Sequence, residues 1–376
     1  MFKWVLILIM AQFEPQGQFT INSSLVGAFT WAGVHNVRIR KSMRTLLTTC
    51  FLEIPGKAQY VPVNGSAPVN VTTRLQFADG DPISISLGYD GVLNNEFTGF
   101  VKRRGASYPF VVECEGYERK LRLNVNKSYT SKQPTTAKAL LQMACEGTGI
   151  TVQCDVDFNI GGLRFVNFNG LQICDTIKEV SDHTLTVFFI NPTTLWCGLP
   201  YSAYAAGGGA QGVTLTNGNK IVNGTSWLGL PSVGYEIGWN CKRDNGLKMR
   251  IPSEPVQVLY NCKLATGSLI NTASKAKVAQ RKLQKLLSHV PDVTTMQGFA
   301  QEKEYTMNYT GYEGKISGLL VPYCTPGMNV YVVDQWTPEL RGTFIAEDTE
   351  VIFGTESGGK RLVGIGPQVG FTNAQA

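Results

Sequence analysis

ISISLGYDGVLNNEFTGFVKRRGASYPFVVEC, residues Ile83–Cys114, shows the fold of this chain most clearly. Apolar side chains alternate with serine and glycine over 83–89, the period of two that gives a strand one apolar face. Asp90-Gly91 follows, a dipeptide that tolerates the positive φ angles of a tight hairpin turn. The chain returns over 96–101 and, after a polar turn, over Pro109–Cys114. The stretch therefore predicts three consecutive strands, half of a small barrel that needs a partner surface.

The composition is that of a β-rich folded protein. The chain has 376 residues, enough for two or three domains, and 43% of them are hydrophobic, enough for a sizeable core. Charged residues make up 16%, against about 25% in a typical protein, and there are 40 glycines. These figures suit a protein with many turns and a surface pressed against neighbours, and they also fit a β-sandwich enzyme. A net charge of +6 is low for a dedicated nucleic-acid-binding domain, so we expect no sequence-specific nucleic-acid binding.

The nine cysteines indicate free thiols rather than a disulfide framework. No Cys-x-x-Cys occurs, the count is odd, and each cysteine lies among apolar or β-patterned neighbours. We therefore expect buried free thiols and folding in a reducing compartment.

Residues 1–17 are expected to form an apolar N-terminal arm. One lysine precedes the apolar run Trp4–Met10, which is too short to span a bilayer. Three interpretations are open: a weak signal peptide, a translation start at Met10 instead of Met1, or an arm that packs on another subunit. Elsewhere no segment approaches ~20 consecutive apolar residues, so we expect no stable membrane span.

Changes in hydrophobic period divide the rest of the chain into three parts. A first β domain covers 18–126. A small α+β domain covers 127–200, because helical and strand spacing alternate there. A second β domain covers 201–370, and the glycine-rich segment 205–212 near its start is the best linker candidate.

A basic helix is predicted over residues 273–290, ASKAKVAQRKLQKLLSHV, inserted in the second β domain. Apolar residues recur there at helical spacing, lysine and arginine cover the other faces, and Pro291 ends the pattern. Three interpretations are open: a solvated helix, a helix that docks on an acidic surface of a partner protein, or one that contacts DNA or anionic lipid. Together with a basic strand near residue 39, it gives a candidate partner interface of Arg38, Arg40, Lys275, Lys277, Arg281, Lys282 and Lys285.

No constellation of residues predicts catalysis, a cofactor or a metal ion. The three histidines are far apart in sequence, and neither a His-Glu-x-x-His nor a Gly-x-Ser-x-Gly motif occurs. Glu347, Asp348 and Glu350 share one predicted strand, a row more typical of a solvated or lumen-facing strand than of a glycosidase. We therefore predict no catalytic, cofactor-binding or metal-binding residue, and a protein that is not an enzyme.

The second β domain repeats the rhythm of the first. MNVYVVD, LRGTFIAEDTEVIF and RLVGIG, within 328–366, again give strand, turn, a strand with a glycine before an aromatic residue, turn and strand. The identity is too low to establish a duplication, but two tandem copies of one small barrel are a common way to build a repeated surface.

The order of these parts resembles the baseplate-hub proteins of phage tails, the late control protein D family, which is related to the N-terminal region of the VgrG spike of type VI secretion. The matching text runs from ISISLGYDGVLNNEFTGFV through PFVVECEGYERKL to TTAKALLQMACEGTGITV. Nearer the C-terminus SKAKVAQRKLQKLL precedes GLLVPYCTPGMNVYVVD, RGTFIAEDTEVIFG and GGKRLVGIG, in the family's order. The resemblance covers about 34–366, and its motifs are short and lie in structural turns.

The resemblance implies a mainly β fold with α+β character: two tube-like β-barrel domains that flank a small α+β domain, with the basic helix inserted in the second barrel. It implies a homotrimer whose six barrels surround a channel and join a six-fold tail tube or distal tail protein to a three-fold spike or tip protein. The expected role is a structural hub of a phage tail or phage-like injection particle, present in the virion and assembled in the host cytoplasm.

An alternative from another class is a secreted β-rich glycan-binding protein or hydrolase of a bacterial surface. The N-terminal apolar run and the two-barrel layout motivate it. A mature chain that starts near Gln12 would favour this alternative.

Overall fold

The computed structural model describes residues 14–65, 67–106, 108–125, 135–154, 159–160, 172–182, 185–202, 214–216, 220–222, 228, 230–242, 246–263, 269–273, 281–288, 293–336 and 341–370. Most of the predicted N-terminal arm and the linker candidate at 205–212 lie outside these residues. The fold is mainly β with a small α+β part, as predicted.

The first β half contains the stretch that indicated the fold. Residues 83–89, 96–101 and 110–114 lie in three neighbouring antiparallel strands, as predicted. Asp90 and Gly91 have φ angles of 51° and 83°, the positive values that the hairpin turn needs. The elements of this half are β1 (Pro15–Ser23), β2 (Gly27–Trp31), β3 (Asn36–Ser42), β4 (Thr49–Ile54), β5 (Lys57–Pro62), β6 (Val69–Thr72), β7 (Pro82–Tyr89), β8 (Val92–Arg104) and β9 (Phe110–Glu115), with the short 3₁₀ helices η1 (Thr73–Leu75) and η2 (Tyr117–Arg122).

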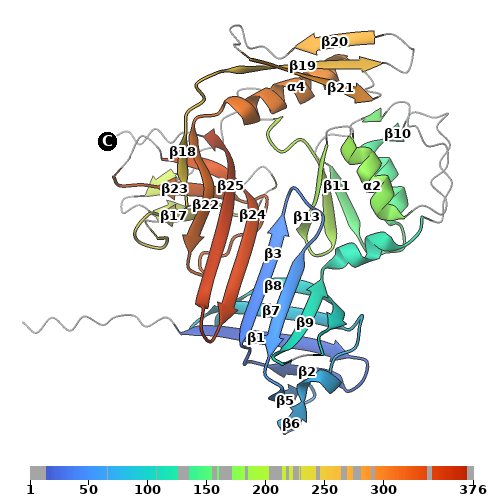
Figure 1. Cartoon of the computed structure of the whole chain (residues 1–376), viewed down its shortest axis with the longest axis vertical. Helices are drawn as coiled ribbons and strands as arrows, with labels where there is room; N and C mark the ends of the chain where they lie inside the picture. Colours follow the sequence, from blue (N-terminus) through green and yellow to red (C-terminus); the bar gives the residue numbers. More distant parts are fainter. Residues whose placement is uncertain are drawn as a thin grey trace, which may run out of the picture.

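The second β half continues the same sheet. Its strands are β17 (Val233–Glu236), β18 (Lys248–Arg250), β22 (Gly311–Gly318), β23 (Asn329–Val333), β24 (Gly342–Gly354) and β25 (Gly358–Gly370). β24 pairs antiparallel with β3, from Asn36 opposite Gly354 to Ser42 opposite Asp348. One 15-stranded sheet therefore runs through both predicted β domains, in the order β18-β22-β25-β24-β3-β4-β9-β8-β7-β1-β2-β5-β6, and β23 joins β17 to β24 beside this path (Figure 1).

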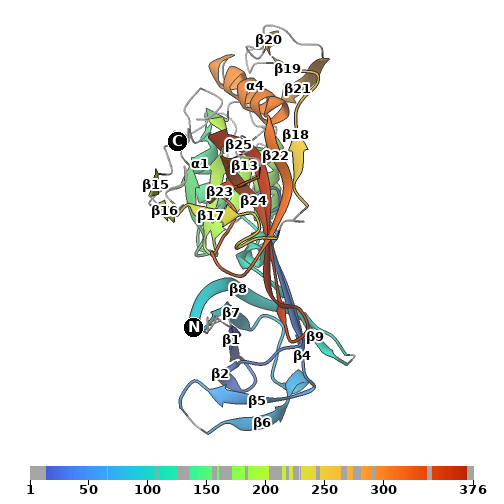
Figure 2. The same cartoon turned by 90° about the vertical axis from the view of Figure 1, so that its left-hand side faces the viewer.

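The two halves also share part of a core. Val351 and Phe353 of β24 are buried in the cluster that contains Phe19 and Ile39 of the first half. Figure 2 shows the result as an elongated molecule, with the first half at one end and β24 and β25 reaching down to it. The long β24–β25 hairpin thus reaches the first half, as does Leu320 in the connection from β22 to β23, which is buried in the same cluster.

The α+β unit packs beside this sheet. It contains β10 (Thr135–Thr136), α1 (Ala137–Cys145), β11 (Thr151–Cys154), β12 (Asn159–Ile160), α2 (Ile173–Asp182), β13 (Thr186–Asn191) and β14 (Thr194–Gly198). The hydroxyl of Thr136 caps α1 by accepting a hydrogen bond from the Ala139 amide at 3.2 Å. Leu140, Leu141 and Ala144 of α1 are buried, as the helical spacing predicts.

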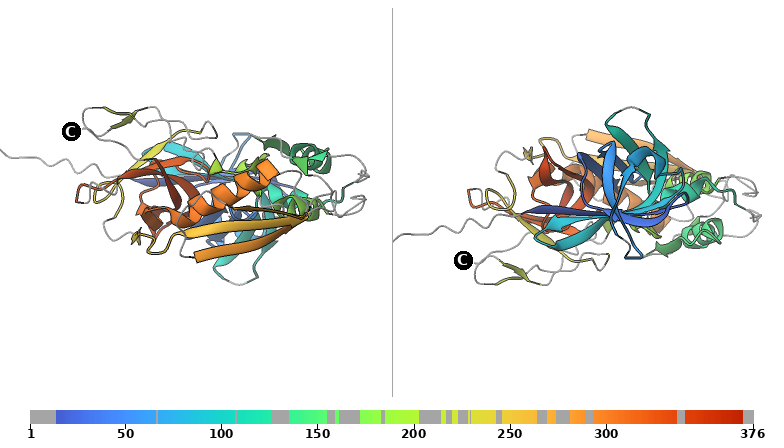
Figure 3. Two further views of the ribbon diagram at one scale, coloured as in Figure 1. Left: turned by 90° about the horizontal axis from the view of Figure 1, so that it is seen from above. Right: turned by 90° about the horizontal axis from the view of Figure 1, so that it is seen from below.

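A further layer lies at the opposite end of the molecule from the first half. β19 (Val256–Lys263), β20 (Leu269–Ala273) and β21 (Arg281–Ser288) form a three-stranded sheet beside α4 (Val293–Asn308) (Figures 1 and 3). The short strands β15 (Thr214–Thr216) and β16 (Lys220–Val222) pair only with each other among the described strands.

The predicted helix over 273–290 is wrong where the structure describes it. Residues 281–288 form strand β21, which pairs in parallel with β19 from Arg281 opposite Val256 to Ser288 opposite Lys263. Eight paired positions give one edge of β21 hydrogen-bond partners on β19, so the tertiary contact overrides the helical spacing of a sequence that suits either structure. The helix of this region is α4 instead, which follows β21 and buries Met296, Phe299 and Ala300.

No helix within the described ranges is long and apolar enough to span a bilayer.

Candidate functional site

The joint between the two halves is built from basic residues of β3 and acidic residues of β24. Arg38 and Arg40 both bind Glu350, Arg38 through a short contact and Arg40 through Nε to Oε1 at 3.0 Å. Burial acts to raise the pKa of Glu350, but the hydrogen bonds from the two arginines outweigh it, and the pKa lies below its usual value. Glu350 is thus a carboxylate held between two guanidinium groups.

The same row of acids continues along β24. Glu347 binds the Arg44 guanidinium and accepts a hydrogen bond from the Tyr201 hydroxyl at 2.7 Å. Asp348 pairs with Lys315 of β22 at 2.7 Å. The prediction of a solvated row is wrong for Glu350 and Glu347, whose side chains are 8% and 12% exposed, whereas the Asp348 side chain is 35% exposed. A lumen-facing position of this strand stays a prediction.

A buried ion pair joins the halves a second time. Arg361 of β25 and Glu96 of β8 are each 1% exposed and form two hydrogen bonds, of 2.5 and 3.1 Å. The Arg361 guanidinium also lies 5.3 Å from the ring centroid of Tyr323. Such a pair is enclosed on all sides, unlike the half-exposed Arg38 and Arg40.

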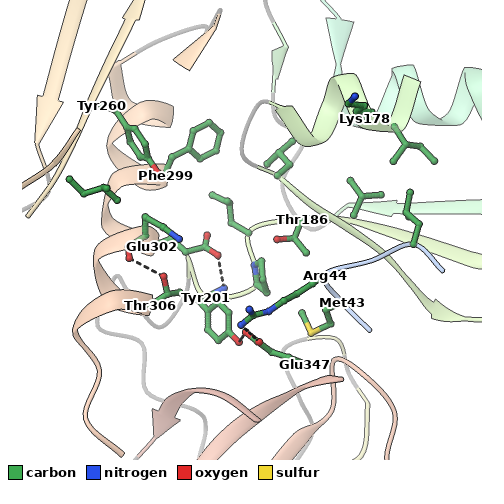
Figure 4. A pocket seen from close by; sticks show the side chains of 18 of the residues that line it. Met43, Arg44, Lys178, Thr186, Tyr201, Tyr260, Phe299, Glu302, Thr306 and Glu347 are labelled. Carbon is green, nitrogen blue, oxygen red and sulfur yellow. Dashed lines mark hydrogen bonds and ion pairs between the residues drawn. The ribbon is translucent and has the colours of Figure 1, made fainter. Parts of the chain in front are cut away.

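A pocket of about 670 Å³ adjoins the joint, where α2, β13 and α4 meet β24 (Figure 4). Its apolar wall is formed by Ile177, Leu185, Val187, Leu199, Leu283 and Phe299. Its charged residues are Arg44, Lys178, Glu302, Lys303 and Glu347. The pocket therefore offers an apolar surface beside charged groups of both signs.

Glu302 is a buried acidic residue of this pocket. Its side chain comes from α4 and points toward the middle of the pocket in Figure 4, and the residue is 8% exposed. Oε1 accepts a hydrogen bond from the Tyr201 amide at 3.3 Å, while Oε2 is buried without a hydrogen-bond partner among the described residues. Burial raises the pKa of Glu302 to about 8, so the side chain is mostly protonated at neutral pH.

A second buried carboxyl lies in a smaller pocket of about 350 Å³, between η2, β8 and the β13–β14 turn. Oε1 of Glu118 accepts hydrogen bonds from the amides of Thr48 at 2.8 Å and Gly116 at 2.9 Å. Burial raises the pKa of Glu118 to about 7 despite these bonds.

The described residues of the predicted interface belong to two different sheets. Arg38 and Arg40 belong to the joint in the 15-stranded sheet, whereas Arg281, Lys282 and Lys285 belong to β21 in the separate three-stranded sheet. Arg281 and Lys282 are exposed there. Lys275 and Lys277 lie outside the described residues, and the candidate interface stays a prediction.

Sequence reasoning missed Glu302, Tyr201 and the Arg361–Glu96 pair. One observation could have revealed the joint: a strand with three arginines within 38–44 and a strand with three acids within 347–350 lie in different predicted domains. Opposite charges on two such strands favour pairing between them. Glu302 sits in the helix that was not predicted, so no pattern identified it.

Within the described residues, no three histidine, cysteine, aspartate or glutamate side chains are grouped so that they could hold a metal ion.

Two solved structures with a similar fold are described as tail proteins. The tail protein from Neisseria meningitidis MC58 matches over 93% of this chain and 96% of its own, with a TM-score of 0.58 and 12% identity. The 43 kDa tail protein of prophage MuSo2 from Shewanella oneidensis matches over 93% and 98%, with a TM-score of 0.55 and 11% identity. The chain shares its fold with these tail proteins.

VgrG has the same fold over part of its length. The Francisella PdpA–VgrG complex in its lidded form matches 95% of this chain with a TM-score of 0.50 and 8% identity. The match covers 53% of that protein, so the tail-protein fold spans about half its length. No protein-family model matches the sequence, and no curated protein does so.

Proposed function

We propose that this chain is the structural hub of a phage tail or phage-like injection particle. Three copies form a ring that lines the DNA ejection channel and joins the six-fold tail tube, or a distal tail protein, to a three-fold spike or tip protein. The hub is part of the virion and assembles in the host cytoplasm. This role is mechanical and needs no catalytic group.

The observation that carries the proposal is the continuous sheet of a fold shared with tail proteins. Each chain contains two β halves fixed to each other by the β3–β24 pairing and by the Arg361–Glu96 pair. Three chains then present six β halves, and this number suits contact with a six-fold tube on one side and a three-fold spike on the other.

The two ends of the sheet support contacts between copies. β6 and β18 each pair with a single described strand, so each leaves one backbone edge unpaired among the described residues. Both ends carry exposed apolar side chains: Val61, Val63 and Val69 at β5 and β6, and Met249 and Ile251 at β18. Two different, unpaired ends favour head-to-tail contacts, and three such contacts close into a ring when each copy is rotated by a third of a turn.

The mass of the purified full-length chain tests the proposal. Light scattering coupled to gel filtration, or native mass spectrometry, should give three copies. The Val69→Lys variant should shift the mass toward one copy, because it places a charge at the β6 edge, whereas Val293→Lys, at an exposed apolar position at the start of α4, should not. A chain that is strictly monomeric and absent from purified particles would overturn the hub, and glycan binding by that monomer would favour the alternative.

A further inference from the structure

We propose that the pocket beside α4 binds a carboxylate-bearing apolar segment of a partner protein. The identity of the partner as a particle protein rests on the proposed function. The chemistry of the site rests only on the 670 Å³ pocket and the residues that line it, above all two lysines at its rim and the buried Glu302.

The rim carries two lysines that lie outside the ion pairs of the described residues. Lys178 on α2 and Lys303 on α4 are exposed and form no ion pair with any described residue. Arg44 also lines the pocket, but its guanidinium is held by Glu347. A ligand carboxylate would therefore meet two available ammonium groups, whereas a ligand cation would be repelled by them.

Glu302 adds a hydrogen-bond donor inside the pocket. Because burial keeps the carboxyl protonated at neutral pH, its O–H can donate a hydrogen bond to a carboxylate or carbonyl oxygen of the bound segment. Other titratable groups line the same pocket around Glu302. They are Lys303 on α4, Tyr201 after β14, Tyr260 on β19, Lys178 on α2, Arg44 after β3 and Glu347 on β24. Ionisation of Glu302 at higher pH would convert the donor into a negative charge and weaken the binding of an anion.

The apolar wall indicates that the ligand also carries an apolar side chain. The volume falls within the roughly 300–1,000 Å³ of typical ligand pockets, so an aromatic or branched side chain fits beside the acid. Leu283 of β21 contributes to this wall, and Arg281 and Lys282 next to it are exposed. Arg281 shares the strand face of Leu283, so its positive charge lies on the pocket side of β21, which favours an acidic ligand.

Three fragments of one shape test the chemistry on the full-length chain: 3-phenylpropanoate, the neutral 3-phenylpropanamide and the cation phenethylammonium. Ligand-observed saturation-transfer NMR at pH 7 should show the tightest binding for 3-phenylpropanoate. Lys178→Glu or Lys303→Glu should each weaken it by about fivefold, the upper end for an exposed ion pair. Lys102→Glu on β8, which also removes an exposed lysine, should leave it unchanged.

The pH dependence separates the carboxylate from a cation as occupant. Binding of 3-phenylpropanoate should weaken from pH 7 to pH 9 in the natural protein and stay constant in Glu302→Gln, which keeps a neutral donor. Circular dichroism checks that both proteins are folded across this range. The proposal is overturned if phenethylammonium binds best and gains affinity with pH, or if no fragment binds at millimolar concentration.

Photo-crosslinking in assembled particles tests the partner. Thr186→p-benzoylphenylalanine places the photoreactive group in the pocket wall. The expected product joins this chain to a different protein, through a peptide with Asp or Glu beside an apolar residue. A crosslink to a second copy of this chain, to a basic peptide or to nothing would overturn the assignment. Fragment binding is measured on the purified chain without particles, and the mass measurement is made without a ligand. The two experiments therefore distinguish failure of this inference from failure of the hub role.

Discussion

Arg361 of β25 and Glu96 of β8 bind each other inside the protein although 265 positions separate them in the sequence. Arg361 also donates to the carbonyl oxygens of Leu320 at 2.9 Å and Cys324 at 3.0 Å. One guanidinium therefore holds a carboxylate of the first half and the β22–β23 connection of the second half. This pair, 1% exposed on both sides, thus couples the two β halves away from solvent.

Removing one partner of this pair should destabilise the protein strongly. Glu96→Gln leaves a buried guanidinium without its counter-charge, at an expected cost of roughly 3–5 kcal/mol in the free energy of unfolding. Chemical denaturation followed by tryptophan fluorescence measures it. The Arg103–Glu113 pair provides the matched control because Arg103 is exposed, so Glu113→Gln should cost at most about 1 kcal/mol. An equal loss of unfolding free energy in the two variants would show that the buried pair stabilises the protein no more than an exposed one.

Gly354 allows β3 and β24 to approach closely. A Cβ at this position would lie 2.2 Å from the His35 carbonyl oxygen and 2.9 Å from the Asn36 Cα. Gly354→Ala should therefore push the strands apart and lower the free energy of unfolding by about 1–3 kcal/mol. Gly33→Ala is the control, since no atom lies within 4 Å of its Cβ position. Thermal unfolding of both variants checks the prediction, and an unchanged Gly354→Ala protein would show that the joint tolerates a wider spacing.

The sequence predicts those elements of the fold that depend on local contacts. The hairpins of β7, β8 and β9 and the helix α1 follow from alternation, turn residues and helical spacing, all of which act within a few positions. The β21 segment shows the limit: RKLQKLLS suits a helix, and only its parallel neighbour β19 makes it a strand. The joint and the pocket were hidden for the same reason, because Glu350, Glu302 and Arg361 gain their roles from residues far away in the chain.

Glu302 and Glu118 should make the protein less stable as the pH rises. Both carboxyls have folded pKa values, about 8 and about 7, above their usual value of 4.5. Between about pH 4.5 and these values the folded state binds more protons than the unfolded state, so each group lowers the free energy of unfolding by up to about 1.4 kcal/mol per pH unit. For each group the loss is complete about one pH unit above its folded pKa.

Glu302→Gln isolates the share of one carboxyl. Its free energy of unfolding should fall less steeply with pH between about 5 and 7.5 than that of the natural protein, by up to about 1.4 kcal/mol per unit. Urea denaturation at several pH values gives both slopes, and the histidines contribute equally to the two proteins. Parallel slopes would mean that the Glu302 carboxyl already ionises at its ordinary pKa in the folded protein.

The thiols should divide into two kinetic classes. All nine cysteines are free, as the sequence predicted, and seven are buried while Cys154 and Cys174 are half-buried. Burial raises the pKa of Cys145 and Cys241 to about 11 and that of Cys324 to about 12, which removes the reactive thiolate at neutral pH. We expect two thiols to react promptly with Ellman's reagent in the native protein and the other seven only after unfolding. Cys154→Ser and Cys174→Ser should each remove one fast thiol. A fast class of three or more, or a disulfide on non-reducing electrophoresis of freshly purified protein, would show that the cores around these residues open more readily than their burial implies.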